Sequence, residues 1–163
     1  MAAPVALGIV GFGIMGERLL RAALDAPPEV VRLAGVWDPS PAAVERLRGI
    51  APQVPVLDSA EATVAASDCL YIASPPAYHL DHARRAFAAG KAAFLEKPLA
   101  VSREEARAFV AEAERSGARG AVNFPMASSP AVAQLSAWRT QGATGTPRAL
   151  SSTVAFGTWP RSW

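Results

Sequence analysis

The chain has few of the residues that define several large classes of protein. It contains one cysteine, Cys69, two histidines and two lysines among 163 residues. A single cysteine cannot form a disulfide within the chain, and so few cysteines and histidines predict neither a metal cluster nor a Cys–His nucleophile pair. Cys69 lies in an apolar run, so we expect a buried core thiol.

Long apolar runs and blocks of like charge are also missing. No apolar run approaches the roughly 20 residues of a membrane span, and no basic region precedes the N-terminal apolar stretch. The net charge is +2 and the pI about 9.1, but the arginines are scattered among acidic residues. The sequence therefore predicts neither a nucleic-acid partner nor a membrane partner. We expect a cytoplasmic location.

The 51% of hydrophobic residues is enough for one good core or for a core plus part of a second. The most informative stretch comes first. An apolar run over residues 5–10 leads into a G-x-G-x-x-G turn, and helical spacing follows over residues 17–24. In such a turn Gly11 allows the tight bend, Gly13 lets the backbone approach a pyrophosphate, and Gly16 lets the helix pack close to the strand. The phosphates would bind the free N–H groups at the helix start.

An acidic residue follows at the spacing that a dinucleotide site needs. Asp38 ends the second apolar run, roughly 20 residues after the last glycine. A carboxylate there accepts hydrogen bonds from both ribose hydroxyls and repels a 2′-phosphate, so we expect NAD in preference to NADP. Arg32 lies earlier in the same strand and Arg46 in a helix, so we expect neither to assist a 2′-phosphate.

Apolar runs alternate with helical patterns over residues 1–124, which predicts an α/β fold with a parallel, doubly wound sheet. Asp58, with Glu61 three residues later, is a candidate helix cap, and Ser102 opens a second capping box. We expect Gly90 and Gly117 to end helices. The expected strands cover residues 5–10, 30–37, 54–57, 69–73, 92–95 and 120–123, and the clearest later helices residues 42–48, 79–89 and 102–116.

The pattern changes after residue 124. Residues 125–130 suit a linker, residues 131–141 a helix, and residues 148–156 alternate as a strand of a second sheet would. One helix and one strand cannot bury a core. We therefore interpret residues 125–163 as the incomplete beginning of a second, α+β domain.

Ligands of doubly wound sheets gather beyond the carboxyl ends of the strands. Lys97 follows a strand in a Glu-Lys-Pro sequence and could donate a hydrogen bond to a substrate oxygen or help to move a proton. A histidine that begins a helix, such as His79, is more often a cap or a packing residue. The groups expected at this edge are Gly11–Gly16, Asp38, Ser74–Pro76, Glu96–Pro98 and Asn123.

Together these motifs resemble the glucose–fructose oxidoreductase / inositol dehydrogenase (Gfo/Idh/MocA) family over about the first 125 residues. The resemblance implies a pyridine-nucleotide oxidoreductase that acts on a sugar, a polyol or a related carbonyl compound. It also implies that Lys97 lies by the nicotinamide and the substrate as the catalytic residue. The cofactor-binding residues implied in this way are Gly11, Phe12, Gly13, Ile14, Met15, Gly16, Asp38, Ser74, Pro75, His79, Glu96, Lys97 and Asn123.

The sequence departs from the family pattern in three places. Phe124-Pro125-Met126 stands where the family often has an arginine or a tyrosine, and Ala92-Ala93 where it usually has His-Val. The D-x-x-x-H type segment of the family's substrate domain, whose histidine often acts as acid and base, does not occur before residue 163. The resemblance further implies that the second domain's sheet forms a homo-oligomer contact when complete.

Three alternatives remain open at this point. A non-catalytic, dinucleotide-binding regulatory protein would share the fold, although Lys97 in its Glu-Lys-Pro setting argues weakly against it. Another Rossmann dehydrogenase or reductase, from amino-acid biosynthesis, would share the glycine turn and the acid, but the Ser74-Pro75 loop together with Lys97 speaks against it. A nucleic-acid-binding module comes last, because the chain lacks a basic stripe and an aromatic platform.

Overall fold

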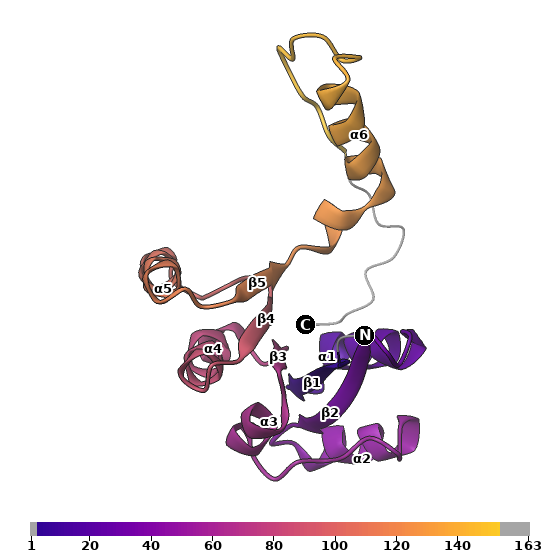
Figure 1. Cartoon of the computed structure of the whole chain (residues 1–163), viewed down its shortest axis with the longest axis vertical. Helices are drawn as coiled ribbons and strands as arrows, with labels where there is room; N and C mark the ends of the chain where they lie inside the picture. The colour runs from indigo at the N-terminus through magenta and orange to yellow at the C-terminus, as the bar shows by residue number, and fades with distance from the viewer. Residues whose placement is uncertain (1–2, 154–163) are drawn as a thin grey trace. The chain divides into compact units, whose positions relative to one another are not determined.

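The computed structural model describes residues 3–153 and divides into two compact units, Met1–Phe124 and Pro125–Trp163. The first unit holds one five-stranded sheet in which every neighbouring pair of strands is parallel, in the order β2-β1-β3-β4-β5 (Figure 1). The predicted α/β fold is confirmed. The strands are β1 (Val5–Val10), β2 (Val31–Trp37), β3 (Cys69–Ile72), β4 (Ala92–Glu96) and β5 (Gly120–Asn123).

Helices cover both faces of this sheet, and each face has its own core. Leu20 and Leu47 pack with Ile9 and Tyr71 on one face. Leu80, Ala83 and Phe109 pack with Leu70 and Ile72 on the other face. The first face is covered by α1 (Ile14–Asp25) and α2 (Pro41–Ile50), and the second by α3 (Ala60–Ala66), α4 (His79–Ala88) and α5 (Arg103–Ser116).

The connection between β2 and β3 crosses from one face of the sheet to the other. The chain that leaves β1 therefore leads to β2 on one side, and the chain that leaves β3 leads to β4 on the other side. This makes the carboxyl ends of β1 and β3 the switch point, where doubly wound sheets bind their ligands.

The third of the six expected strands does not form as a strand. Residues 54–57 make only an isolated bridge, in which Val56 pairs in parallel with Val36 of β2. Pro55 lacks an N–H and therefore cannot donate to a ladder. Beside this bridge Gly35 has φ +152°, and the register of β2 against β1 shifts between Leu7 and Gly8. The edge strand of the sheet is therefore β2, to which Val56 adds a single bridge.

The helix caps agree with the sequence except at α3. Ser59, not Asp58, caps this helix by accepting the N–H of Ala62 at 3.0 Å, because the serine is the residue that adopts the extended cap position. Ser102 caps α5 as expected by accepting the N–H of Glu105. The helix then ends at Gly117, which has φ +66°.

Cys69, at the first position of β3, packs against the core of the first face but is only partly buried. The expected position of the thiol against the core is confirmed, whereas its burial is incomplete. Its burial is still sufficient to raise the pKa of the thiol above its usual range, against the opposing effect of Arg119.

The second unit contains a short 3₁₀ segment, η2 (Pro125–Ser128), and α6 (Pro130–Thr140), which Ser129 caps. No residue of α6 is buried. Residues 148–153 lie in no strand, contrary to the expectation for residues 148–156, since an isolated strand has no partner for its backbone groups. The remainder of that range lies outside the described residues. Within residues 3–153 no helix has the length and apolarity to cross a membrane.

Candidate functional site

Five groups of predicted residues follow the five strands at one edge of the sheet. Read across the sheet, they are Asp38 after β2, the glycine turn after β1, Ser74 after β3, Lys97 after β4 and Asn123 at the end of β5. Residues far apart in the sequence are thus placed in one row. Asp38 and Lys97 lie on opposite sides of the β1–β3 switch point.

The three glycines of the turn meet different surroundings. Gly11 has φ +92°, and a Cβ built on it would lie 2.6 Å from the carbonyl carbon of Ala73. A Cβ on Gly16 would lie 2.1 Å from the Gly11 oxygen, whereas a Cβ on Gly13 would have no neighbour within 4 Å. Gly11 and Gly16 are therefore required by the protein's own packing, and Gly13 opens onto free space at the start of α1.

The first turn of α1 is open at this point. Gly13 is its N-cap residue, and no side chain caps the helix. Ile14 and Gly13 are exposed and Met15 is half-buried, while the Phe12 side chain is completely buried in the core. Among the turn residues, Phe12 can therefore face a ligand only through its backbone.

Asp38 closes the turn from the neighbouring strand. Its Oδ2 accepts the N–H of Phe12 at 2.6 Å, and its Oδ1 accepts the N–H of Ser40 at 2.8 Å. Each carboxylate oxygen has a second lone pair and can accept another hydrogen bond. The half-buried carboxylate is thus held rigidly with acceptor capacity remaining.

Arg46, which nothing in the sequence places beside a 2′-phosphate, also reaches the turn. Its Nη2 donates to the Phe12 carbonyl oxygen, and its guanidinium carbon lies 5.4 Å from the centre of the Phe12 ring. Glu17 Oε2 is 3.5 Å from Arg46 Nε. The connection from β2 into α2 places Arg46 beside the glycine turn, and the helical periodicity of the sequence alone does not reveal this contact.

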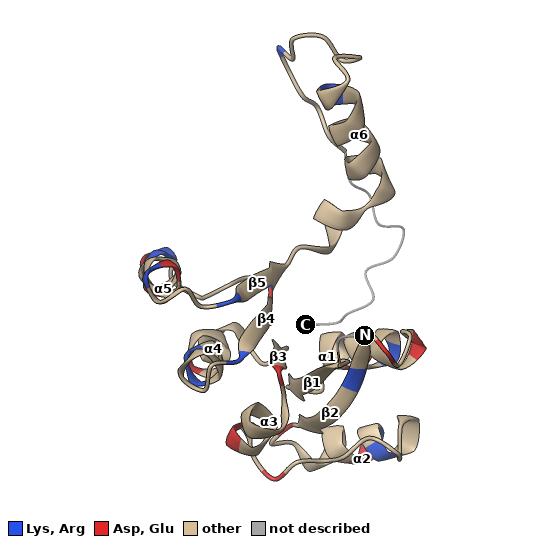
Figure 2. Ribbon diagram, in the orientation of Figure 1, with Lys and Arg blue, Asp and Glu red and all other residues tan. Residues whose placement is uncertain are grey.

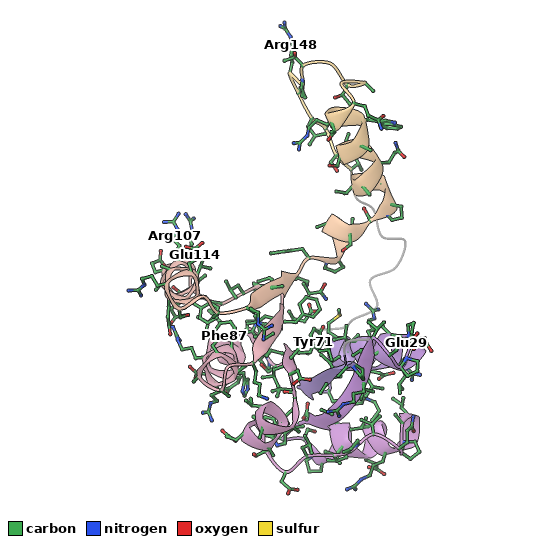
Figure 3. The ribbon with its side chains drawn as sticks, viewed as in Figure 1. Glu29, Tyr71, Phe87, Arg107, Glu114 and Arg148 are labelled. Carbon is green, nitrogen blue, oxygen red and sulfur yellow. The ribbon has the colours of Figure 1, made fainter. Side chains whose placement is uncertain are left out.

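A buried network lies directly before Lys97. Glu96 is 5% exposed, and its Oε1 accepts both the Tyr71 hydroxyl at 2.5 Å and the Asn123 amide at 2.6 Å. Burial and the hydrogen bond to Glu96 raise the pKa of Tyr71 above its usual range. These contacts join β3, β4 and β5, and Figure 3 labels Tyr71 within the sheet.

Tyr71 is the residue of this network that the sequence did not identify. It lies in an apolar strand whose pattern indicates core packing, and its ring does pack against Phe94 with the centroids 5.4 Å apart. The sequence indicated only that a tyrosine lies shortly before Ser74, where a candidate loop begins. A buried hydroxyl requires a partner, and that partner is Glu96.

His79 ties two loops of this edge together. It is 1% exposed, with Nε2 2.8 Å from the Ser74 carbonyl oxygen and Nδ1 2.9 Å from the Pro98 carbonyl oxygen. Both ring nitrogens are engaged with the backbone, so the histidine positions the loops after β3 and β4. Ser74 Oγ is buried and has no hydrogen-bond partner within the described part of the chain.

Lys97 and Pro98 are exposed at the end of β4, beyond the buried Glu96. A separate cavity of about 410 Å³ lies between the ends of α4 and α5, near Phe87, Lys91 and Arg119. Lys91 and Arg119 precede β4 and β5, so this cavity belongs to the opposite edge of the sheet. It shares no residue with the row described above.

The residues of the row fit a dinucleotide. The open space at Gly13 and the uncapped start of α1 suit a pyrophosphate, and Asp38 retains acceptors for ribose hydroxyls. Charged residues elsewhere lie on the helices, and α4 and α5 each carry both blue and red segments (Figure 2).

Comparison with known proteins agrees with this arrangement. Residues 5–124 match the model of an oxidoreductase family with an NAD-binding Rossmann fold, Gfo/Idh/MocA. An inositol 2-dehydrogenase of Cereibacter sphaeroides is 37% identical over 117 residues, which is 69% of this chain and 34% of that protein. A second inositol 2-dehydrogenase of that species is 39% identical over 119 residues, which is 70% of this chain and 33% of that protein. The chain thus spans about a third of the length of the curated relatives it matches.

Solved structures share the fold. The scyllo-inositol dehydrogenase of Lactobacillus casei, in a structure with bound NAD(H) and scyllo-inositol, has a TM-score of 0.77 at 21% identity, covering 87% of this chain and 42% of that one. The UDP-N-acetylglucosamine 3-dehydrogenase of Acidithiobacillus ferrooxidans has a TM-score of 0.75 at 24% identity, covering 90% and 44%. With the family model matched over residues 5–124 and the glycine turn, Asp38 and Lys97 in one row, the chain belongs to the Gfo/Idh/MocA family of NAD-binding oxidoreductases.

Proposed function

We propose that this chain is the nucleotide-binding part of an NAD-dependent dehydrogenase that acts on a hydroxyl-bearing carbon of a sugar or polyol. The observation that carries the proposal is the row itself. Asp38, the glycine turn and Lys97 follow β2, β1 and β4 at one edge, so a single extended ligand can meet all three. The similarity to inositol 2-dehydrogenases supports a polyol or sugar as the substrate class.

In this proposal the chain's residues divide the binding of NAD among them. The N–H groups at the start of α1 hold the pyrophosphate beside Gly13, and Asp38 accepts hydrogen bonds from the adenosine ribose. Ser74 and Pro75 follow β3, between the glycine turn and Lys97, and would contact the middle of the cofactor, while His79 fixes the loop that carries them. Bound NAD supplies a nicotinamide ring that accepts hydride from the substrate carbon.

Lys97 is the proposed catalytic residue. Its ammonium group, exposed after β4, donates a hydrogen bond to the substrate oxygen. It stabilises the negative charge that develops there as the hydroxyl proton passes to a general base, which the substrate domain would supply, and the hydride passes to NAD⁺. Glu96 is buried beneath it, and Tyr71 and Asn123 fix the Glu96 carboxylate. This rigid support holds the end of β4, and with it Lys97, in position.

Three further parts of the proposal concern the whole protein. Residues 1–124 are assigned as the NAD-binding domain, and residues 125–163 as the beginning of a substrate and oligomerisation domain. The partly buried single thiol is compatible with a reducing, cytoplasmic compartment. Light scattering on a product of this gene that includes the substrate domain tests the expected homo-oligomer.

Titration with NADH tests the proposal on the chain as it stands. Nicotinamide fluorescence should report saturable binding that Gly13→Val abolishes, because the side chain fills the space left for the pyrophosphate. Gly49→Val is the matched control, since Gly49 is exposed on α2 and its added Cβ also meets open space. Equal binding by both variants, or none by the folded wild-type chain, contradicts the proposed site.

Turnover tests the second half of the proposal. A product of this gene that includes the substrate domain should reduce NAD⁺ with inositols or related polyols. Lys97→Met should lower kcat by about a hundredfold or more and should change NADH affinity by a much smaller factor, because the pyrophosphate and ribose contacts remain. NADH binding without turnover on any polyol or sugar would favour the dinucleotide-binding regulatory protein instead.

A further inference from the structure

Asp38 and Arg46 contact the same residue of the glycine turn from different elements. The Phe12 N–H donates to Asp38 Oδ2, and the Phe12 carbonyl oxygen accepts from Arg46 Nη2. The acid comes from the end of β2 and the cation from the middle of α2. A negative and a positive side chain therefore contact the backbone of one residue, Phe12, on either side of its Cα, where the ribose end of a dinucleotide is expected.

The Arg46 guanidinium retains capacity for a ligand. Its side chain is 43% exposed, and the group carries five N–H donors. Nη2 contacts the Phe12 oxygen and Nε lies 3.5 Å from Glu17 Oε2. Glu17 is shared with Arg21, whose Nη2 is 2.9 Å from Glu17 Oε1. The net charge of Asp38, Glu17, Arg46 and Arg21 is thus zero. Removing the charge of one acid would make the net charge that a ligand meets positive.

We propose that Arg46 is a preplaced ligand for a 2′-phosphate and that the charge of Asp38 is what prevents its use. This rests on the proposed function, because it concerns the same nucleotide site. A 2′-phosphate would enter beside the carboxylate that otherwise accepts the ribose hydroxyls, and the two negative groups would repel. Without that charge, an arginine beside the turn can bind phosphate oxygens through two N–H groups.

Removing the Asp38 charge should therefore change the cofactor preference in one step. We expect Asp38→Asn, which keeps the shape of the side chain, to raise the ratio of NADPH to NADH affinity by about tenfold or more. Asp38→Ser should do the same with a smaller side chain. Fluorescence titrations with both cofactors give the ratio, and circular dichroism with thermal unfolding checks that each variant is folded.

The second substitution tests the arginine. Adding Arg46→Gln to Asp38→Asn should abolish most of the gain in the ratio, whereas adding Arg48→Gln, which removes an exposed charge from the same helix, should leave it. The ratio is the informative quantity because NADH and NADPH share the pyrophosphate. Damage to the turn weakens both cofactors alike, and only loss of a 2′-phosphate contact weakens NADPH selectively.

The outcomes separate this proposal from the one on which it depends. NADH binding that Gly13→Val abolishes, with no gain for NADPH in either Asp38 variant, overturns the role of Asp38 and Arg46 and leaves the dinucleotide site intact. A gain that Arg46→Gln does not reduce overturns the assignment of Arg46. Absence of NADH binding by the folded wild-type chain overturns the proposed function, and this proposal with it.

Discussion

At the scale of single residues, the structure shows polar groups whose partners determine how the candidate site is held. The motifs of the sequence identified Glu96 and His79 as candidate residues, but the contacts of these two side chains could not be predicted from it. Asp38 could be predicted because its function follows from its distance to the glycine turn. Tyr71 and Arg46 could not, because their partners are 25 and 34 residues away and depend on strand order and helix crossing.

Tyr71→Phe should destabilise the chain by about 2 kcal/mol at pH 7, because it removes a buried hydrogen bond to a carboxylate. The raised pKa of Tyr71 adds a pH dependence. The Tyr71 phenol ionises near pH 10 in the unfolded chain and at a higher pH in the folded chain. The stabilisation from the Tyr71–Glu96 hydrogen bond is therefore present in full below pH 10 and is lost as the pH rises further. The difference between wild type and Tyr71→Phe should therefore narrow above pH 10.

Urea unfolding at pH 7, 9, 10 and 11 measures this difference. Tyr78→Phe is the matched control, since Tyr78 is 57% exposed, and it should change stability by less than about 0.5 kcal/mol. A gap between wild type and Tyr71→Phe that stays constant from pH 9 to 11 would show that the Tyr71 phenol is not held neutral.

His82 predicts a pH effect of the opposite sense. Its Nδ1 is buried without a hydrogen-bond partner within residues 3–153, its ring lies 6.3 Å from that of Trp37, and burial lowers its pKa. The unfolded ring gains a proton below about pH 6.5 while the folded ring resists it, so this contribution to stability is lost as the pH falls. His82→Phe should stabilise the chain by about 1 kcal/mol at pH 7, and by more at pH 5.

Denaturation midpoints of wild type and His82→Phe at pH 5, 6, 7 and 8 check this prediction. The advantage of the variant should grow steadily toward low pH. An advantage that shrinks on acidification would mean that the folded His82 ring binds a proton readily.

At the scale of elements, periodicity and turn residues predicted most of the fold. Strands β1, β2, β4 and β5 and helices α4 and α5 lie where the apolar patterns and the capping residues place them. Residues 54–57 and the described residues 148–153 form no strand, although strands were expected there. Residues 54–57 make a single bridge to Val36 at the edge of the sheet, and residues 148–153 pair with no strand. Local pattern describes a strand's own sequence, but whether it pairs depends on distant residues.

The glycine turn allows a prediction that separates folding from binding. Gly11→Ala should destabilise the chain by about 3 kcal/mol, because the backbone has positive φ and the Cβ would overlap the Ala73 backbone. Gly13→Ala should change stability by less than about 0.5 kcal/mol, since its φ of −75° and its open surroundings accept a methyl group. It should nevertheless weaken NADH binding.

Thermal unfolding and NADH titration of the two alanine variants measure both effects. Equal losses of stability would contradict the distinction between a glycine required by packing and one required by a ligand. Full NADH affinity in a stable Gly13→Ala protein would contradict the close approach of a pyrophosphate at that residue.

At the scale of the whole molecule, the two units differ in how much they bury. Both cores belong to residues 1–124, whereas α6 buries no residue and exposes half of Trp138. A chain that ends at Phe124 should therefore unfold at the same temperature as the full chain, within about 3 °C, and bind NADH with the same affinity. Calorimetry and titration of the two chains test this, and a large loss of either property would assign residues 125–163 to the stability of the first unit.

The most direct test of the central claim is a map of NAD binding by ¹H–¹⁵N NMR on the full chain. We expect saturating NADH to shift the amides of Gly13, Asp38, Ser74 and Lys97 most, because these residues follow four neighbouring strands at one edge. The amides of Lys91 and Arg119, at the opposite edge, should change little. Shifts centred on Lys91 and Arg119, or shifts at Gly13 that do not extend to Lys97, would contradict a cofactor that spans the edge from Asp38 to Lys97.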